Sequence, residues 1–145
     1  MMLKEILKNK GSRVWTVRAD QTLYEALHLL VNQNIGALVV LNDSEEIVGI
    51  ISERDIIRGC YFMSRELEET QVADLMTRRV ITAAPEEDIN QIMQVMTVNR
   101  IRHIPVVHEG ELVGIISIGD VVKTLMEDSA HQIQNLKEFI YGPVL

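Results

Sequence analysis

The chain has 145 residues, of which 47% are apolar, and its 14 Lys and Arg residues against 21 Asp and Glu residues give a net charge of −7. This length and composition predict one ordinary globular domain with a real core, and the acidic balance argues against nucleic acid as the main partner, because no basic surplus displaces counterions from a phosphate backbone. The single cysteine, Cys60, excludes an internal disulfide and predicts a cytoplasmic location, and no apolar run approaches the ~20 residues of a bilayer span, so no membrane partner is expected.

The chain opens with MMLKEILKNKG, and residues 1–13 are predicted to form an N-terminal helical segment. It has no apolar stretch followed by a small-residue cleavage site, so it is not predicted to be a signal peptide. Its apolar residues Leu3, Ile6 and Leu7 recur at helical spacing. We expect them to form a stripe on a short surface helix and to contribute to an interface with a second copy of the chain.

A repeated phrase dominates the rest of the sequence. GIISERDI, which begins at Gly49, returns as GIISIGDV, which begins at Gly114, with Gly, Ile, Ile, Ser and Asp in the same places. The segment that begins at Val14 likewise matches the segment that begins at Val80. The two spacings differ by one residue, which falls in the polar turn before the repeated phrase, and hairpin turns tolerate such a change easily. The pattern therefore indicates an internal duplication.

Each copy predicts the same order of elements. A short extended entry at Thr16 or Thr82 leads to an amphipathic helix with apolar residues at i, i+3, i+4 and i+7. An apolar strand, a tight polar turn, a second strand and a helix follow. The helical core positions are Leu23, Ala26, Leu27 and Leu30 in one copy and Ile89, Ile92, Met93 and Met96 in the other, and the strands are 37–41, 47–51, 104–107 and 112–116. The sequence therefore predicts an α+β fold of two tandem β-α-β-β-α repeats.

The predicted boundaries follow from this order. Repeat 1 covers residues 14–60, a polar linker covers 61–71, repeat 2 covers 72–126, and a helical C-terminal extension covers 127–145. One unit of roughly 60 residues buries only a marginal fraction of its surface. We therefore expect the repeats to pack through their sheets around a pseudo-two-fold axis, with grooves between them.

The Ser and Asp of the repeated phrase have two interpretations. Ser-x-x-Asp before a helix is a capping box, in which Ser52 or Ser117 is the N-cap and Asp55 or Asp120 its partner. The same residues also suit a nucleotide, because a helix N-terminus attracts phosphate and a carboxylate accepts hydrogen bonds from the two ribose hydroxyls. Either copy alone leaves both interpretations open, and the duplication favours a ligand.

From about Val14 to about Met126 the chain resembles a tandem CBS-domain pair, also called a Bateman module. The resemblance depends on Thr16 and Thr82 before the helices, ALVVLND and HIPVVHEG before the turns, the paired GIIS-x-x-D, and VADLMT at the start of the second repeat. It implies a disc with two clefts that bind adenosine-containing ligands. We expect AMP as the ligand, with ATP, ADP and NAD(H) as further candidates and with no obligatory cofactor.

The resemblance also implies that each cleft combines residues of both repeats. One cleft would contain Thr16, Val17, Ala37, Ser117 and Asp120. The other would contain Ser52, Arg54, Asp55, Thr82, Ala83, Arg102, His103 and Ile104. Because the second set holds more basic residues, we expect the phosphate-rich ligand in that cleft.

The implied function is a non-catalytic regulatory module for signal transduction, which senses energy or redox state and acts on an unidentified partner protein. An enzyme is not predicted, because the sequence has no Walker loop, no GxSxG, no paired catalytic carboxylates with a base and no redox cysteine pair. The histidines lack clustered ligand spacing, so no metal site is expected. Two alternatives stay open: a structural homodimerisation module with unoccupied clefts, and an S-adenosylmethionine sensor.

The C-terminal extension carries a pattern of its own. The helical pattern runs from Asp120 to Tyr141 and stops at Gly142-Pro143. Its apolar stripe consists of Val122, Leu125, Ile133, Leu136 and Ile140. This face needs a cover, which is either the chain's own domain or the counterpart helix of a second copy. We expect a homodimer, since discs commonly pair in the family that the chain resembles.

Overall fold

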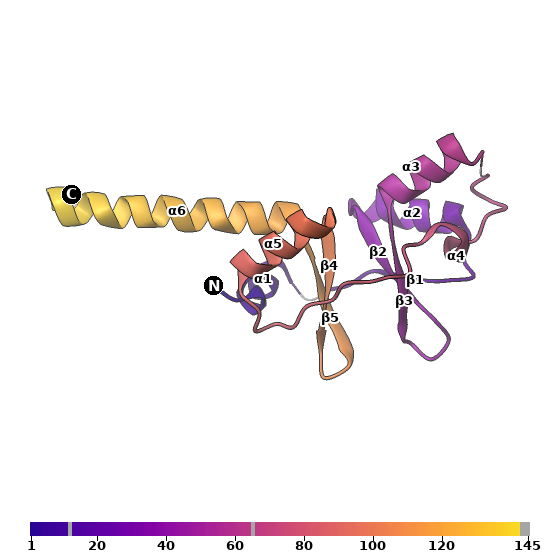
Figure 1. Cartoon of the computed structure of the whole chain (residues 1–145), viewed down its shortest axis with the longest axis horizontal. Helices are drawn as coiled ribbons and strands as arrows, with labels where there is room; N and C mark the ends of the chain where they lie inside the picture. The colour runs from indigo at the N-terminus through magenta and orange to yellow at the C-terminus, as the bar shows by residue number, and fades with distance from the viewer. Residues whose placement is uncertain (12, 65, 143–145) are drawn as a thin grey trace. The chain divides into compact units, whose positions relative to one another are not determined.

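The computed structural model describes residues 1–11, 13–64 and 66–142. It divides into two compact units. The first unit is Arg13–Thr82, and the second unit combines Met1–Ser12 with Ala83–Leu145. Each unit has a small sheet with helices in nearly the predicted order (Figure 1), which confirms the α+β class.

The first unit contains a three-stranded sheet. Its elements are β1 (Thr16–Arg18), α2 (Leu23–Gln33), β2 (Ala37–Leu41), β3 (Ile47–Ser52), α3 (Glu53–Phe62) and α4 (Val72–Leu75). β1 is parallel to β2, and β2 is antiparallel to β3. The side chains of Leu23, Ala26 and Leu30 on α2 are buried in the core of this unit. The helical face predicted from the apolar spacing is therefore the core face.

The described part of the second unit contains a two-stranded sheet and three helices. Its elements are α1 (Leu3–Lys10), α5 (Ile89–Asn99), β4 (His103–His108), β5 (Glu111–Ser117) and α6 (Ile118–Tyr141). β4 and β5 are antiparallel, and their pairing carries an irregularity between Val106 and Val107. The corresponding irregularity in the first unit lies between Val40 and Leu41. The two hairpins thus share their register down to one irregular step.

The second repeat differs from the predicted order in its entry strand. Within the described residues, Ala83 forms only an isolated parallel bridge with Val106 instead of a strand. In the first unit the ladder is continued by Ala19, whose N–H donates to the Leu41 carbonyl at 3.3 Å. The residue that corresponds to Ala19 is Pro85, which has no N–H to donate, so the ladder stops.

The short helices α1 and α4 are counterparts in the duplication. The segment Val72–Met76 (VADLM) corresponds to Leu3–Leu7 (LKEIL), with apolar residues at the same places. Each helix packs on the sheet of the other repeat: a Cβ at Gly49 of β3 would meet the Met76 side chain, and one at Gly114 of β5 would meet Leu7. Both glycines therefore permit a close helix approach. The repeats of the sequence and the compact units of the structure do not have the same boundaries.

The burial of α1 corrects the interface predicted for it. Leu3, Ile6 and Leu7 are 0%, 5% and 9% exposed and belong to the core of the second unit. The first helix of the chain contacts β5 and α6 with this face. The apolar stripe of α1 is therefore already covered and is not available to a second copy of the chain.

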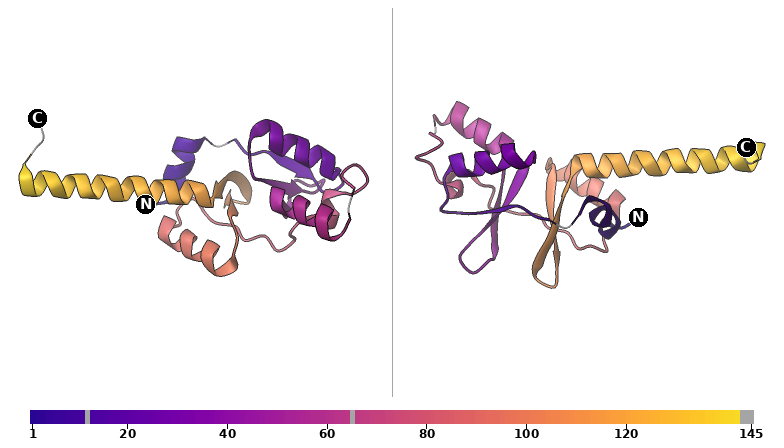
Figure 2. Two further views of the ribbon diagram at one scale, coloured as in Figure 1. Left: turned by 90° about the horizontal axis from the view of Figure 1, so that it is seen from above. Right: turned by 180° about the vertical axis from the view of Figure 1, so that it is seen from behind.

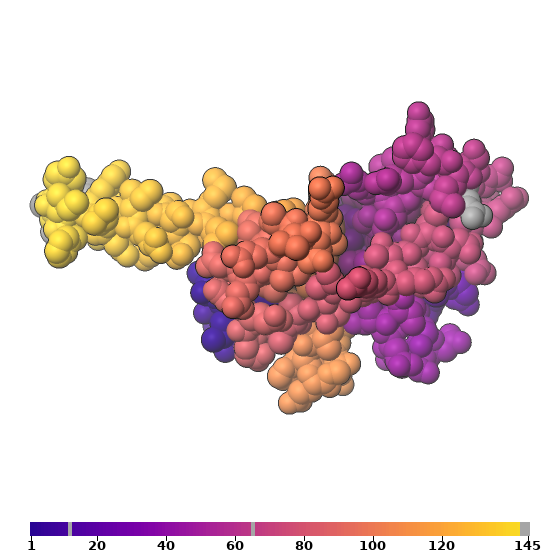
Figure 3. Space-filling view, in the orientation of Figure 1, coloured from indigo at the N-terminus to yellow at the C-terminus, as the bar shows by residue number. Residues whose placement is uncertain are grey.

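The long helix α6 begins in the core and continues beyond it. Val121 is buried and Leu125 is partly buried against the second unit, whereas every residue from Ser129 to Tyr141 is exposed. α6 runs past α1 and α5 as a single rod (Figure 2, Figure 3). Its described part does not fold back on its own unit, and the predicted stop at Pro143 lies outside the described residues. None of the described helices is long and apolar enough to span a bilayer.

Candidate functional site

Both copies of Ser-x-x-Asp form complete capping boxes. In the first, Ser52 Oγ accepts a hydrogen bond from the Asp55 amide at 3.2 Å, and Asp55 Oδ2 accepts from the Ser52 amide at 2.9 Å. In the second, Ser117 Oγ accepts from the Asp120 amide at 3.1 Å, and Asp120 Oδ2 accepts from the Ser117 amide at 2.9 Å. The capping interpretation is thus confirmed for α3 and α6. It leaves a ligand role open, because the described bonds to both carboxylates end at Oδ2 and not at Oδ1.

The first turns of α3 and α6 offer fewer free amides than a bare helix N-terminus. The Glu53 amide donates to the Gly36 carbonyl at 3.1 Å, and the Ile118 amide donates to the Arg102 carbonyl at 2.8 Å. The third amide of each turn is used by the capping serine. One amide in each first turn has no partner among the described residues, that of Arg54 or Gly119. A phosphate can therefore accept a hydrogen bond from one free backbone amide in the first turn of each helix rather than from several.

The start of the first apolar strand lies beside the capping serine in both units. Ala37 pairs with Ser52, and His103 pairs with Ser117. Ala37 and Ile104 are both buried, and Ile104 belongs to the core of the second unit. These two residues can contribute only main-chain groups to a ligand.

The two entry segments also contain buried residues that were predicted to bind the ligand. Val17 and Ala83 are buried, whereas Thr16 is half-buried and Thr82 is exposed. Of these four residues, only the two threonines can therefore contact a ligand through their side chains. The predicted clefts combine residues of both units and stay a prediction.

The predicted basic residues Arg54 and Arg102 are both exposed. Neither forms an ion pair with another described residue. Their guanidinium groups are therefore available to an anion. His103 is half-buried at the start of β4.

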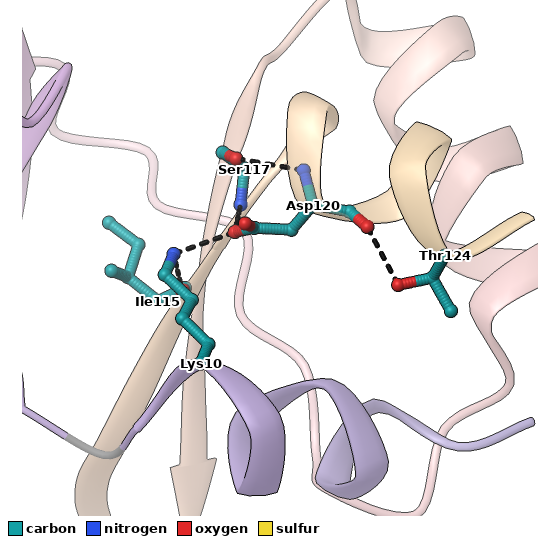
Figure 4. A network of polar contacts seen from close by, with 5 residues as sticks. All are labelled: Lys10, Ile115, Ser117, Asp120 and Thr124. Carbon is teal, nitrogen blue, oxygen red and sulfur yellow. Dashed lines mark hydrogen bonds and ion pairs between the residues drawn. The ribbon is translucent and has the colours of Figure 1, made fainter. Parts of the chain in front are cut away.

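Lys10 is a basic residue beside the second capping box that the sequence did not predict. Its Nζ lies 2.6 Å from Asp120 Oδ2 and donates a second hydrogen bond to the Ile115 carbonyl at 2.9 Å (Figure 4). Burial raises the pKa of the Asp120 carboxyl, but the bonds from Lys10 and Ser117 and the charge of Lys10 lower it more, so that the pKa lies below its ordinary value. The set of predicted cleft residues that contains Asp120 was expected to have fewer basic residues. A cation, Lys10, nevertheless lies beside Asp120.

The only sequence signal for this pair was indirect. Lys10 and Asp120 are 110 positions apart, so no local pattern joins them. The correspondence of α1 with the VADLM segment was the signal, since it places α1 inside a repeat instead of before it.

The sequence model of the CBS domain matches residues 3–61 and 72–127 of the chain. The chain belongs to the CBS-domain family. Each matched CBS domain begins at its leading helix, α1 or α4, so the first starts ahead of the boundary expected at residue 14. No group of three or more His, Cys, Asp or Glu side chains among the described residues of this CBS-domain protein could hold a metal ion.

Similar proteins agree with a CBS-domain pair. The chain is 38% identical to CBS domain-containing protein CBSX3, mitochondrial, of Arabidopsis thaliana, over 97% of this chain and 72% of that protein. The crystal structure of CBS-domain containing protein ATU1752 from Agrobacterium tumefaciens matches with a TM-score of 0.80 and 38% identity, over 84% of this chain and 91% of that one. The CBS domain pair of protein MJ0100, in complex with 5′-methylthioadenosine and S-adenosyl-L-methionine, matches with a TM-score of 0.77 and 26% identity, over 88% and 98%.

Proposed function

We propose that this CBS-domain pair is a non-catalytic regulatory module that binds an adenosine-containing ligand and thereby alters a partner protein. The observation that carries the proposal is the duplicated capping box, in which Asp55 and Asp120 each keep one carboxylate oxygen without a described partner. A ribose with two adjacent hydroxyls matches such an oxygen, as acidic residues do in dinucleotide folds. The structure of the MJ0100 pair with two adenosine compounds supports the same ligand class.

AMP is the first candidate among these ligands. The exposed Arg54 and Arg102 favour an anionic ligand over neutral adenosine. The net charge of −7 opposes the accumulation of further negative charge, which disfavours ATP relative to AMP. ADP, ATP, NAD(H) and S-adenosylmethionine complete the set of ligands to be tested.

The direct test is thermal unfolding of the full chain with adenosine, AMP, ADP, ATP, NADH and S-adenosylmethionine, each in excess. A ligand at ~100 times its Kd stabilises the folded state by ~2.7 kcal/mol, which raises the melting temperature measurably. We expect the largest shift with AMP and a smaller one with 2′-deoxy-AMP, which lacks one ribose hydroxyl. A melting temperature that no compound changes would contradict the proposal.

We also propose that α6 joins two copies of the chain into a homodimer. One face of α6 carries a series of residues at alternating steps of four and three, which is the heptad spacing of a coiled-coil seam. The seam consists of Val122, Met126, Ser129, Ile133, Leu136 and Ile140. The seam contains Met126 where the predicted stripe contained Leu125, because Leu125 is partly buried in its own unit and Met126 is exposed.

A second copy suits this seam for two reasons. The first and last residues of the seam are 18 positions apart, or about 27 Å at 1.5 Å per residue, and none of its six residues is charged. The same face of another α6 can therefore pack on it without burying a charge. Ile133, Leu136 and Ile140 are 55%, 58% and 59% exposed, which leaves large apolar side chains in water in a lone chain. The helix is anchored at its start by Val121, so pairing does not have to nucleate it.

Charge substitutions test the dimer without shortening the chain. Ile133→Glu combined with Leu136→Glu should convert the dimer to a monomer in light scattering. The matched control is Gln132→Glu combined with Gln134→Glu, which adds the same charge on exposed positions outside the seam and should leave the dimer intact. Removal of residues 128–145 should also give a folded monomer. An unchanged oligomeric state in the first variant would contradict the α6 interface.

The cellular location and the alternative function are still supported by the sequence alone. The cytoplasmic location is a prediction from the single Cys60, and the name of the Arabidopsis relative assigns that protein to the mitochondrion. A homodimerisation module with unoccupied clefts is the function that would remain if the ligand panel gave no response.

A further inference from the structure

The two capping boxes differ in what holds the carboxylate. Asp120 Oδ2 receives the Lys10 ammonium at 2.6 Å and the Ser117 amide at 2.9 Å. Asp55 Oδ2 receives the Ser52 amide at 2.9 Å and the Ser52 hydroxyl at 3.0 Å. Among the described residues, Asp55 has no basic partner.

The difference has a structural origin in the leading helices. After α4 the chain forms a bridge, in which Thr77 and Ile50 exchange two backbone hydrogen bonds of 3.0 and 2.9 Å. α1 instead continues for another turn, and its last residue, Lys10, donates to the carbonyl of Ile115, the counterpart of Ile50. A lysine side chain thus contacts β5 where backbone contacts β3. Within residues 1–11, 13–64 and 66–142, therefore, only the second unit brings an ammonium to its capping box.

The chemistry of the second donor decides how easily each carboxylate changes partners. The Ser52 hydroxyl is neutral and rotates freely about its C–O bond, so a ligand hydroxyl can take its place at little cost. The Lys10 ammonium carries a full charge and is also held by the Ile115 carbonyl. Lys10 and Asp120 are 37% and 25% exposed at their side chains, so water screens this ion pair only in part.

We infer that Lys10 determines the ligand preference of the two boxes: Asp55 can accept both ribose hydroxyls, whereas Asp120 accepts the second one at Oδ2 only after Lys10 has released that oxygen. The inference rests on the proposed function and assigns unequal affinities to its two sites. It also assigns a role to α1, because a ligand that takes Asp120 frees the end of α1 from its ion pair with α6.

Calorimetric titration of the full chain with AMP and with neutral adenosine tests this inference. We expect two binding events in the unmodified protein, the weaker with a Kd at least ten times larger, and we expect Asp55→Asn to weaken the tighter event roughly 10- to 150-fold. Lys10→Met keeps the aliphatic stem and removes the charge, so the weaker event should tighten at least five-fold. Lys8→Met is the matched control: it removes the same charge from an exposed position of the same helix and should leave both events unchanged.

A salt titration of the unmodified protein tests the same point without a substitution. Salt weakens the partly exposed ion pair but not the attraction of neutral adenosine, so the weaker adenosine event should tighten from low salt to 0.5 M NaCl. A weaker event that is unchanged or loosened in Lys10→Met, or one that does not tighten with salt, overturns the inference while leaving the proposed function intact. A lack of any binding heat in both the unmodified protein and Lys10→Met overturns both.

Discussion

The two units of the chain share the hairpin and the capping box, and they differ in the leading segment that covers the outer strand. In the first unit this segment is the four-residue helix α4 followed by a backbone bridge between Thr77 and Ile50. In the second unit it is the eight-residue helix α1, which ends in the contact of Lys10 with Ile115 and Asp120. The hairpin and box depend on backbone hydrogen bonds that both copies need, whereas the leading segment needs only an apolar face. The leading segment can therefore differ between the two copies. Among the described residues, Asp120 has a basic partner, Lys10, and Asp55 has none.

The burial of α1 gives the largest expected effect on this comparison. Leu3 is fully buried in the second unit, so Leu3→Ala should lower the free energy of unfolding by about 2–5 kcal/mol through lost burial and the cavity that remains. Ile133→Ala, at an exposed position of α6, is the control. Both substitutions are compared in a chain that Leu136→Glu has made monomeric. Urea unfolding measures the difference. A change within about 0.5 kcal/mol for Leu3→Ala would show that α1 is a surface appendage, as the sequence predicted.

The close approach of the leading helices gives the next effect. A Cβ at Gly49 would lie 2.5 Å from the Met76 sulfur and 3.1 Å from the Thr77 carbonyl oxygen, whereas a Cβ at Gly114 would meet only the flexible end of Leu7. Gly49→Ala should therefore cost about 1–3 kcal/mol and Gly114→Ala less, since backbone yields less easily than a side chain. Thermal unfolding of the two variants measures the order. Equal losses would argue that the two helices approach their strands alike.

The ion pair beside the second box gives the smallest effect. Asp120→Asn should reduce the free energy of unfolding by about 1 kcal/mol near neutral pH, because it weakens the capping box and removes the attraction to Lys10. The pKa of Asp120 is lowered in the folded chain, so this stability is present above the ordinary carboxyl pKa and is lost as the pH falls through the lowered value. Unfolding curves of both proteins should therefore converge in strong acid. A gap that persists there would assign the effect to something other than the charge.

The sequence predicted the features that local patterns determine. The apolar periodicity of α2 and α5, the two hairpins and the two Ser-x-x-Asp boxes are confirmed, because each depends on residues within a few positions of one another. The missing strand at Ala83 was not foreseen, although Pro85 stood in the sequence, because the ladder bond that it removes is visible only once Ala19 and Leu41 are paired.

The parts that were missed depend on contacts distant in sequence. The stripe of α1 is correctly apolar, but the pattern of Leu3, Ile6 and Leu7 does not say whether the chain itself or a second copy covers it. Lys10 was overlooked for the same reason, since its partner Asp120 comes near only when α1 packs on β5. The ligand residues themselves stay a prediction, which the titrations above address.

The most direct test of the central claim, that a capping carboxylate also binds the ligand ribose, is a calorimetric titration of AMP into the full chain and two variants. Asp55→Asn removes the proposed ribose acceptor, and Asp74→Asn is its matched control, because Asp74 is the capping-box carboxylate of α4 and lies outside the predicted site. The account predicts that Asp55→Asn weakens the tighter AMP event by about 1.5–3 kcal/mol, or roughly 10- to 150-fold, while Asp74→Asn leaves it unchanged. An unchanged AMP affinity in Asp55→Asn, together with a lowered melting temperature like that of Asp74→Asn, would mean that the box only caps its helix and would contradict the account.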